Sequence, residues 1–167
     1  MKKNMIWLMV LALVIADPLS AQDSKKVRDS VRQEKIKNLV ESRVYDFIAQ
    51  SATPMSGRIR YLNTDYSLEL RQDSMAADLP YFGRAYAAPI NPAEGGIRFK
   101  SSDFQYEIKD ARNGGWNIKI KPKDVPDIQQ LIMQISANGY ATLQVTSTNR
   151  QAISFNGYIR ERNQRKK

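Results

Sequence analysis

The strongest constraint on the fold is an alternation of apolar and polar residues that runs through most of the chain after residue 44. The segment WNIKIKP, 116–122, places Trp116, Ile118 and Ile120 on one side of an extended chain and polar residues on the other. The segment FQYEIKD, 104–110, alternates in the same way, and RNGG, 112–115, between them is a turn sequence. These residues predict a β-hairpin over 104–121.

Similar short segments recur at intervals of about a dozen residues, which is typical of a sandwich or a barrel. A turn cluster at 63–65 divides RIRYL from YSLELRQ and predicts a second hairpin over 58–71, with Ile59 and Tyr61 facing inward. We therefore expect a mainly β fold, an antiparallel β-sandwich or barrel of about eight strands, preceded by one N-terminal helix. The remaining segments with a strand pattern are 44–50, 96–101, 140–147 and 153–162.

Two segments leave the choice between helix and strand open. VYDFIAQ, 44–50, can extend the preceding helix, but its aromatic and β-branched residues favour a strand. Residues 126–138 place Ile128, Leu131, Ile132 and Ile135 on one helical face, and they also fit an imperfect strand alternation. The second segment cannot be assigned from its pattern.

The N-terminal part of the chain has the pattern of a secretory signal peptide over residues 1–21. Lys2 and Lys3 precede an apolar run, 5–16, which is shorter than the roughly 20 residues that span a bilayer, so a retained anchor is the weaker alternative. A small residue, Ala21, marks the expected cleavage point. The chain contains no cysteine, which excludes a bacterial lipid anchor. We expect a periplasmic or secreted protein.

Removal of 21 residues from the 167 leaves 146, which is the length of one domain. We expect a polar helix at 22–43, because this segment lacks glycine and proline. Its apolar positions do not form one continuous stripe: Val27 and Val31 lie nearly opposite Ile36 and Val40 on a helical wheel. The antiparallel β domain is expected at 44–160, and a basic tail at 161–167.

The positive charge of the chain is concentrated at its C-terminal end. The formal net charge is +9, and residues 160–167 contribute +4 of it. The remaining body is nearly balanced, which argues against a nucleic-acid surface. The tail is interpreted as a solvated terminus, with weak contact to an anionic surface as the alternative.

The composition also removes several classes of chemistry. The chain contains neither histidine nor cysteine, so it lacks the commonest general base and the usual zinc ligands. No glycine-rich phosphate loop or calcium loop is present, and we expect no cofactor and no metal site. A carboxylate pair from two distant strands, as in glycoside hydrolases, stays open as a minor alternative.

The segment LPYFGRAY, 79–86, is the most unusual stretch of the chain. Tyr81, Phe82 and Tyr86 give it more apolar surface than a loop normally carries, and an arginine, Arg84, lies among them. Pro80 restricts the backbone just before this group. The segment is followed by a run rich in proline and glycine, 88–96, and is therefore expected to be a loop.

Two interpretations of this loop are compatible with its residues. In the first, the three aromatic rings close the open end of the sheet and Arg84 pairs with Asp73 or Asp78. In the second, Tyr81, Phe82, Arg84 and Tyr86 form a ligand-binding site in which the guanidinium meets a carboxylate or a phosphate.

The block LPYFGRAY, together with GGIRF at 95–99, resembles an uncharacterised secreted family of Gram-negative bacteria, domain of unknown function 4251. The resemblance extends through FIAQSATP, 47–54, and NRQAISFNG, 149–157, and covers nearly all of the chain after the signal segment. It implies a β-rich exported domain without a lipid anchor. It implies no activity, cofactor or catalytic residue.

The leading functional hypothesis is an exported non-enzymatic domain that binds a small ligand or a partner protein through the loop at 79–86. A structural or adaptor protein of the cell envelope, which uses the basic helix or the tail, is the alternative. A carboxylate-based hydrolase is the third hypothesis.

Overall fold

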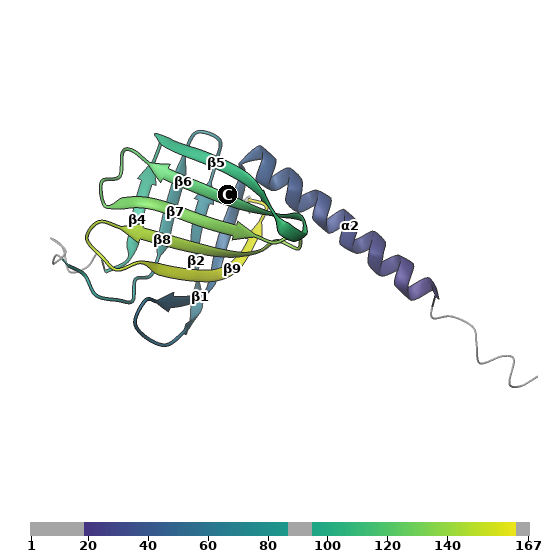
Figure 1. Ribbon diagram of the computed structural model, residues 1–167, viewed down its shortest axis with the longest axis horizontal. Helices are drawn as coiled ribbons and strands as arrows, with labels where there is room; N and C mark the ends of the chain where they lie inside the picture. Colours follow the sequence, from purple (N-terminus) through teal and green to yellow (C-terminus); the bar gives the residue numbers. More distant parts are fainter. Residues whose placement is uncertain (1–18, 87–94, 163–167) are drawn as a thin grey trace, which may run out of the picture. The chain divides into compact units, whose positions relative to one another are not determined.

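The computed structural model describes residues 19–86 and 95–162. The apolar run of the expected signal peptide and residues 163–167 of the expected basic tail lie outside this part of the chain. The described residues begin with the helix α2, Leu19–Ser42, whose end from residue 33 onward belongs to the same compact unit as all the described strands (Figure 1). No helix of the described residues is long and apolar enough to span a membrane.

Nine strands follow the helix and form one antiparallel sheet. The sheet order is β4-β3-β2-β1-β9-β8-β7-β6-β5, so the first and last strands are neighbours at its centre. The strands are β1 Tyr45–Pro54, β2 Arg60–Leu70, β3 Met75–Leu79, β4 Ile97–Ser101, β5 Phe104–Ala111, β6 Gly115–Pro122, β7 Ile128–Ile135, β8 Tyr140–Ser147 and β9 Ile153–Arg160.

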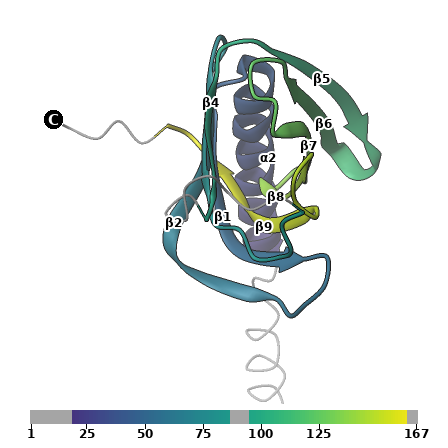
Figure 2. The same ribbon diagram turned by 90° about the vertical axis from the view of Figure 1, so that its left-hand side faces the viewer.

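The sheet curls into a nearly closed barrel that stays unpaired between β4 and β5. Figure 2 shows β2 and β4 on one side of this body and β5, β6 and β7 on the other. The prediction of a mainly β fold with one N-terminal helix is confirmed.

The inward residues of both sides meet in one hydrophobic core. The predicted alternation is correct for β6, where Trp116, Ile118 and Ile120 are buried, and for the inward residues of β8 and β9. The end of α2 that belongs to the same unit contributes Ile36 and Val40 to this core. The largest fully buried side chains are those of Tyr45, Phe47, Phe155, Leu68, Leu70, Met75, Leu79, Ile118, Ile120, Leu131, Met133 and Leu143.

The helix ends at a tyrosine pair that connects it to two strands. Arg43 follows α2 with a φ of 57°, a left-handed conformation that stops the helix. Its guanidinium lies 4.8 Å from the ring centre of Tyr106 in β5. The Tyr106 hydroxyl lies 3.3 Å from that of Tyr45 in β1, so this contact links β1 and β5 across the interior.

The corner between β4 and β5 is held by the carboxylate of Asp124 from the β6–β7 turn. The Ser101 hydroxyl donates a hydrogen bond to it, and the backbone N–H groups of Ser102 and Asp103 donate at 2.8 and 3.3 Å. These donors, the Ser101 hydroxyl first among them, hold the pKa of Asp124 below its usual value. The side chain of Asp124 thus stabilises the β4–β5 turn, which lies between the two strands that stay unpaired with one another.

Both segments with an open assignment are strands. Residues 44–50 fall largely within β1, and Ile128–Ile135 forms β7, which is hydrogen-bonded to β6 and to β8. Both segments form strands because each lies between two other strands of the sheet. Hydrogen bonds to both neighbours satisfy the backbone N–H and C=O groups, and alternate side chains are buried.

The predicted hairpin over 58–71 is wrong. Residues 60–70 form the single strand β2, and the polar cluster at 63–65 is a bulge within it. Ala49 of β1 faces Tyr66 of β2, and Ser51 of β1 faces Tyr61. Between these two pairs β1 advances by two residues and β2 by five, so the extra residues of β2 form the bulge. Ile59 and Tyr61 are 55 and 84% exposed rather than inward, because the strand here extends beyond the core.

Candidate partner-binding surface

The loop at 79–86 is attached to the β8–β9 turn by backbone hydrogen bonds. Tyr86 N–H donates to the carbonyl oxygen of Asn149 at 2.7 Å, and Gln151 N–H donates to that of Arg84 at 3.1 Å. Ala85 and Arg150 form the antiparallel bridge between these two contacts. The loop is therefore held in a defined position at the end of the sheet.

Two of the four predicted ligand-binding residues are used to hold this loop. The Tyr81 hydroxyl oxygen lies 2.8 Å from the carbonyl oxygen of Arg84 and 3.2 Å from that of Gln151, so its one proton is shared between these two acceptors. Burial raises the pKa of this hydroxyl, so it stays protonated and able to donate. The Arg150 guanidinium lies 5.3 Å from the centre of the Tyr81 ring, and that of Arg60 lies 4.8 Å from the Phe82 ring. Both rings pack against the core.

The other two predicted residues face solvent. Tyr86 is 69% exposed, and Arg84 is also exposed. Arg84 does not pair with either predicted aspartate within the described part of the chain: Asp78 is paired with Arg98, at 2.8 Å, and no ion pair involves Asp73. The loop thus divides into an anchored pair and an exposed pair.

The β1–β2 turn lies beside this loop and adds exposed apolar side chains to the same end of the sheet. The Ser56 hydroxyl lies 3.5 Å from the side-chain oxygen of Gln151, and Arg60 reaches the Phe82 ring, so the turn and the loop are neighbours. Met55 is 69% exposed. We call the solvent-facing residues of this end the tip surface; they are Met55, Arg58, Ile59, Tyr61, Arg84 and Tyr86.

The tip surface is positively charged and lacks acidic residues. Three segments form the tip surface and the residues beneath it: 51–64, 79–86 and 144–156. Together they contain four arginines and no aspartate, glutamate or lysine. Asp127, which accepts a hydrogen bond from Asn149 at 2.8 Å, is an adjoining carboxylate. Among the described residues, neither Arg58 nor Arg84 forms an ion pair. Their guanidinium groups are available to an outside partner.

The buried acidic residue Asp46 belongs to an ion-paired network. The described residues contain no group of three or more acidic side chains that could hold a metal ion. Asp46 is buried and lies 2.8 Å from Arg71, which also contacts Glu69 at 3.2 Å. This arrangement is an ion-paired network around one guanidinium, and the acids in it are engaged with that cation.

The comparisons with known proteins bear on family and fold. A family model described as domain of unknown function (DUF4251) matches residues 27–159. The chain belongs to this family. A crystal structure of a DUF4251 family protein from Bacteroides eggerthii is similar, with a TM-score of 0.58 and 11% sequence identity, over 81% of this chain and 91% of that one. At this identity the likeness shows the fold alone. No curated protein matches the chain, and the family indicates no enzymatic class.

Sequence reasoning identified the loop at 79–86 and missed the residues around it. The pattern indicates only a break between strands around Met55, and it predicts Arg58 as an outward residue of a strand and Ile59 and Tyr61 as inward residues. A signal was present, because residues 55–61 combine methionine, tyrosine and arginine without any acidic residue. That composition is typical of protein interfaces.

Proposed function

We propose that the protein is an exported, non-enzymatic domain that binds an acidic partner protein through the tip surface. The observation that carries this proposal is the presence of two exposed arginines without counter-charges, Arg58 and Arg84, among exposed side chains of methionine, isoleucine and tyrosine. Interface cores are enriched in aromatic residues, methionine and arginine, and are depleted of lysine and glutamate.

The support beneath the tip surface favours binding. Tyr81 and Phe82 fix the backbone from below, so the exposed side chains of Arg84 and Tyr86 start from a restricted position. A surface that is already ordered loses less conformational entropy when a partner binds. The unpaired guanidinium groups attract carboxylates over distance and accelerate association.

Two parts of the proposal, export and a non-enzymatic role, are supported by the amino-acid sequence. The first 21 residues have the order of a signal peptide, with a basic start, an apolar run and a small residue at its end. The absence of histidine and cysteine removes the side chains that most often supply a base or a nucleophile near neutral pH. A binding role requires neither.

The test begins with a photo-crosslinking amino acid in place of Tyr86, in the bacterium that makes the protein. The same amino acid in place of Gln105, exposed on β5, is the control. We expect a discrete protein adduct from position 86 only. Mass spectrometry identifies the adduct, and the purified partner is then used for binding measurements.

The second step compares charge variants of the protein. R58E/R84E should bind the partner at least about tenfold more weakly than wild type, with a smaller dependence on salt, because exposed charges of an interface steer association. K100E/K121E changes the net charge equally at two exposed residues elsewhere and should bind like wild type. Equal loss in both variants, or no loss in R58E/R84E at an unchanged melting temperature, contradicts the proposal.

A further inference from the structure

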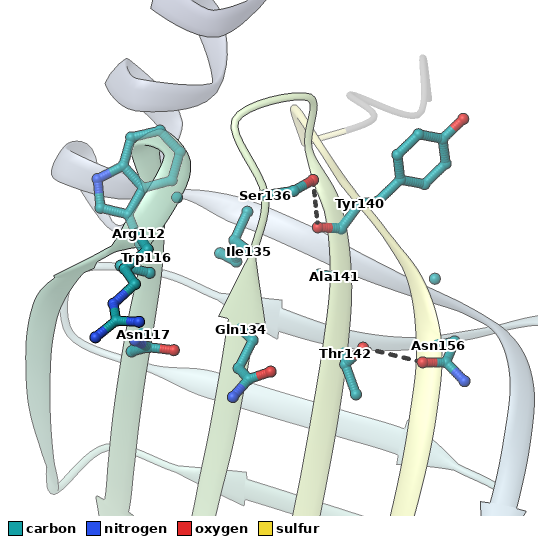
Figure 3. A pocket seen from close by; sticks show the side chains of 13 residues that line it. Arg112, Trp116, Asn117, Gln134, Ile135, Ser136, Tyr140, Ala141, Thr142 and Asn156 are labelled. Atoms are coloured by element: carbon teal, nitrogen blue, oxygen red, sulfur yellow. Dashed lines mark hydrogen bonds between the residues drawn. The ribbon is translucent and has the colours of Figure 1, made fainter.

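A separate hollow of about 630 Å³ lies on the outer face of the sheet, across β6, β7, β8 and β9. It opens to solvent, and Figure 3 shows the side chains that line it. The lining includes one charged residue, Arg112, and no carboxylate. None of its residues belongs to the tip surface, so the hollow is a second candidate binding site.

Four uncharged polar side chains form a row across this hollow. Asn117 faces Gln134, Gln134 faces Thr142, and Thr142 faces Asn156 in the register of consecutive strands. All four side chains are exposed, and in Figure 3 they lie side by side on the outer face. Because neighbouring strands are about 4.8 Å apart, the row extends over about 14 Å.

The row offers both donors and acceptors at each amide. The Thr142 hydroxyl donates a hydrogen bond to the side-chain oxygen of Asn156 at 2.9 Å, which directs the amide N–H₂ of Asn156 away from this contact. Asn117 and Gln134 each present an oxygen that accepts and a nitrogen that donates. Such a row can pair with ligand groups that are donors and acceptors at the same time.

The β7–β8 turn forms one end of the hollow, and in Figure 3 the side chain of Arg112 extends toward Asn117. The Ser136 hydroxyl donates to the carbonyl oxygen of Tyr140 at 3.1 Å, which closes this turn. The Tyr140 ring is 60% exposed, and in Figure 3 it is directed away from the polar row.

We propose that this hollow binds a neutral oligosaccharide. Hydroxyl groups of sugars both donate and accept hydrogen bonds, and they repeat along a chain, as the amide and hydroxyl groups of the row do. The lining contains no carboxylate to pair with a cationic ligand, and its single arginine makes an extended polyanion a poor match. This proposal is independent of the partner protein at the tip surface.

The test uses side-chain amide signals in ¹H–¹⁵N nuclear magnetic resonance spectra of the full folded protein. The probes are tetrasaccharides of glucose in α- and β-linkage, of mannose, of xylose and of N-acetylglucosamine. A tetragalacturonide is the anionic comparison, and an extended tetrapeptide of alanine is the peptide comparison. We expect saturable shifts at Asn117, Gln134 and Asn156 with at least one neutral tetrasaccharide.

Two variants establish the site of binding. The dissociation constant of Q134A/N156A for the same tetrasaccharide should be at least about fivefold higher than that of wild type. Each of the two substitutions removes an amide side chain that forms hydrogen bonds with the sugar. Q105A/Q129A removes two exposed glutamines outside the hollow and should bind like wild type. The proposal is overturned if no neutral probe shifts these signals at concentrations on the order of 10 mM, a range that detects millimolar dissociation constants. It is also overturned if the galacturonide or the peptide binds more tightly, or if both variants bind like wild type.

Discussion

Replacement of Tyr81 by phenylalanine removes one oxygen from the support of the tip surface. This hydroxyl lies 2.8 Å from the carbonyl oxygen of Arg84 and 3.2 Å from that of Gln151. A hydrogen bond of this kind contributes about 1 kcal/mol to the free energy of unfolding. For a folded body of this size, that loss corresponds to a decrease in Tm of about 4 °C. Arg84→Ala removes an exposed side chain and should change the stability by less than about 0.5 kcal/mol.

Thermal unfolding followed by circular dichroism measures the difference between the two variants. Amide hydrogen exchange adds a local measurement, since the N–H groups of Tyr86 and Gln151 form the contacts between the loop and the β8–β9 turn. We expect both amides to exchange faster in Tyr81→Phe and to be unchanged in Arg84→Ala. An unchanged Tm in Tyr81→Phe, or a decrease of several degrees in Arg84→Ala, would refute the division of the loop into anchored and exposed residues.

Two further predictions concern charged groups of the body. Arg71→Ala should lower the free energy of unfolding by about 3 kcal/mol, because the buried carboxylate of Asp46 loses its cation, and D46A/R71A should recover part of this loss. Urea denaturation measures both variants, and strictly additive losses would count against the ion pair. Asp124→Ala should destabilise the β4–β5 corner at pH 7. The folded pKa of Asp124 lies below its ordinary value of 3.8, so this carboxylate stabilises the folded state above that pH, and its contribution is lost as the pH falls through the folded pKa. The difference in Tm between wild type and Asp124→Ala should therefore shrink below pH 3.8, and a constant difference between pH 7 and pH 2.5 would contradict this role.

Alternation along the chain was sufficient to predict most of the strands, because burial on one face imposes a period of two. The prediction failed at Ile59, just before β2, and at Tyr61, near the start of β2, because these apolar residues alternate but are exposed. It was also incomplete for β5, an edge strand in which the predicted inward residue Ile108 is 40% exposed. Periodicity identifies the residues that share a face, and it does not show whether another layer covers that face.

The candidate sites depended on contacts between segments that are far apart in the sequence. Composition singled out the loop at 79–86, but its anchors, Asn149 to Gln151 and Arg60, come from other turns and strands. The polar row of the outer hollow combines residues from positions 117 to 156 through strand register alone. No local pattern marks these four residues as a set.

The central position of β1 beside β9 has a consequence for how this chain reaches its native state. The strands β1–β4 and β5–β9 are two successive meanders, and the pairing of β1 with β9 joins them. That pairing brings together residues about 100 or more positions apart, as does the contact of Lys35 with Glu161 at 3.0 Å. The barrel can therefore be completed only after the ribosome has released almost the whole polypeptide. Until then, neither meander has the other beside it to complete the hydrophobic core that the two share.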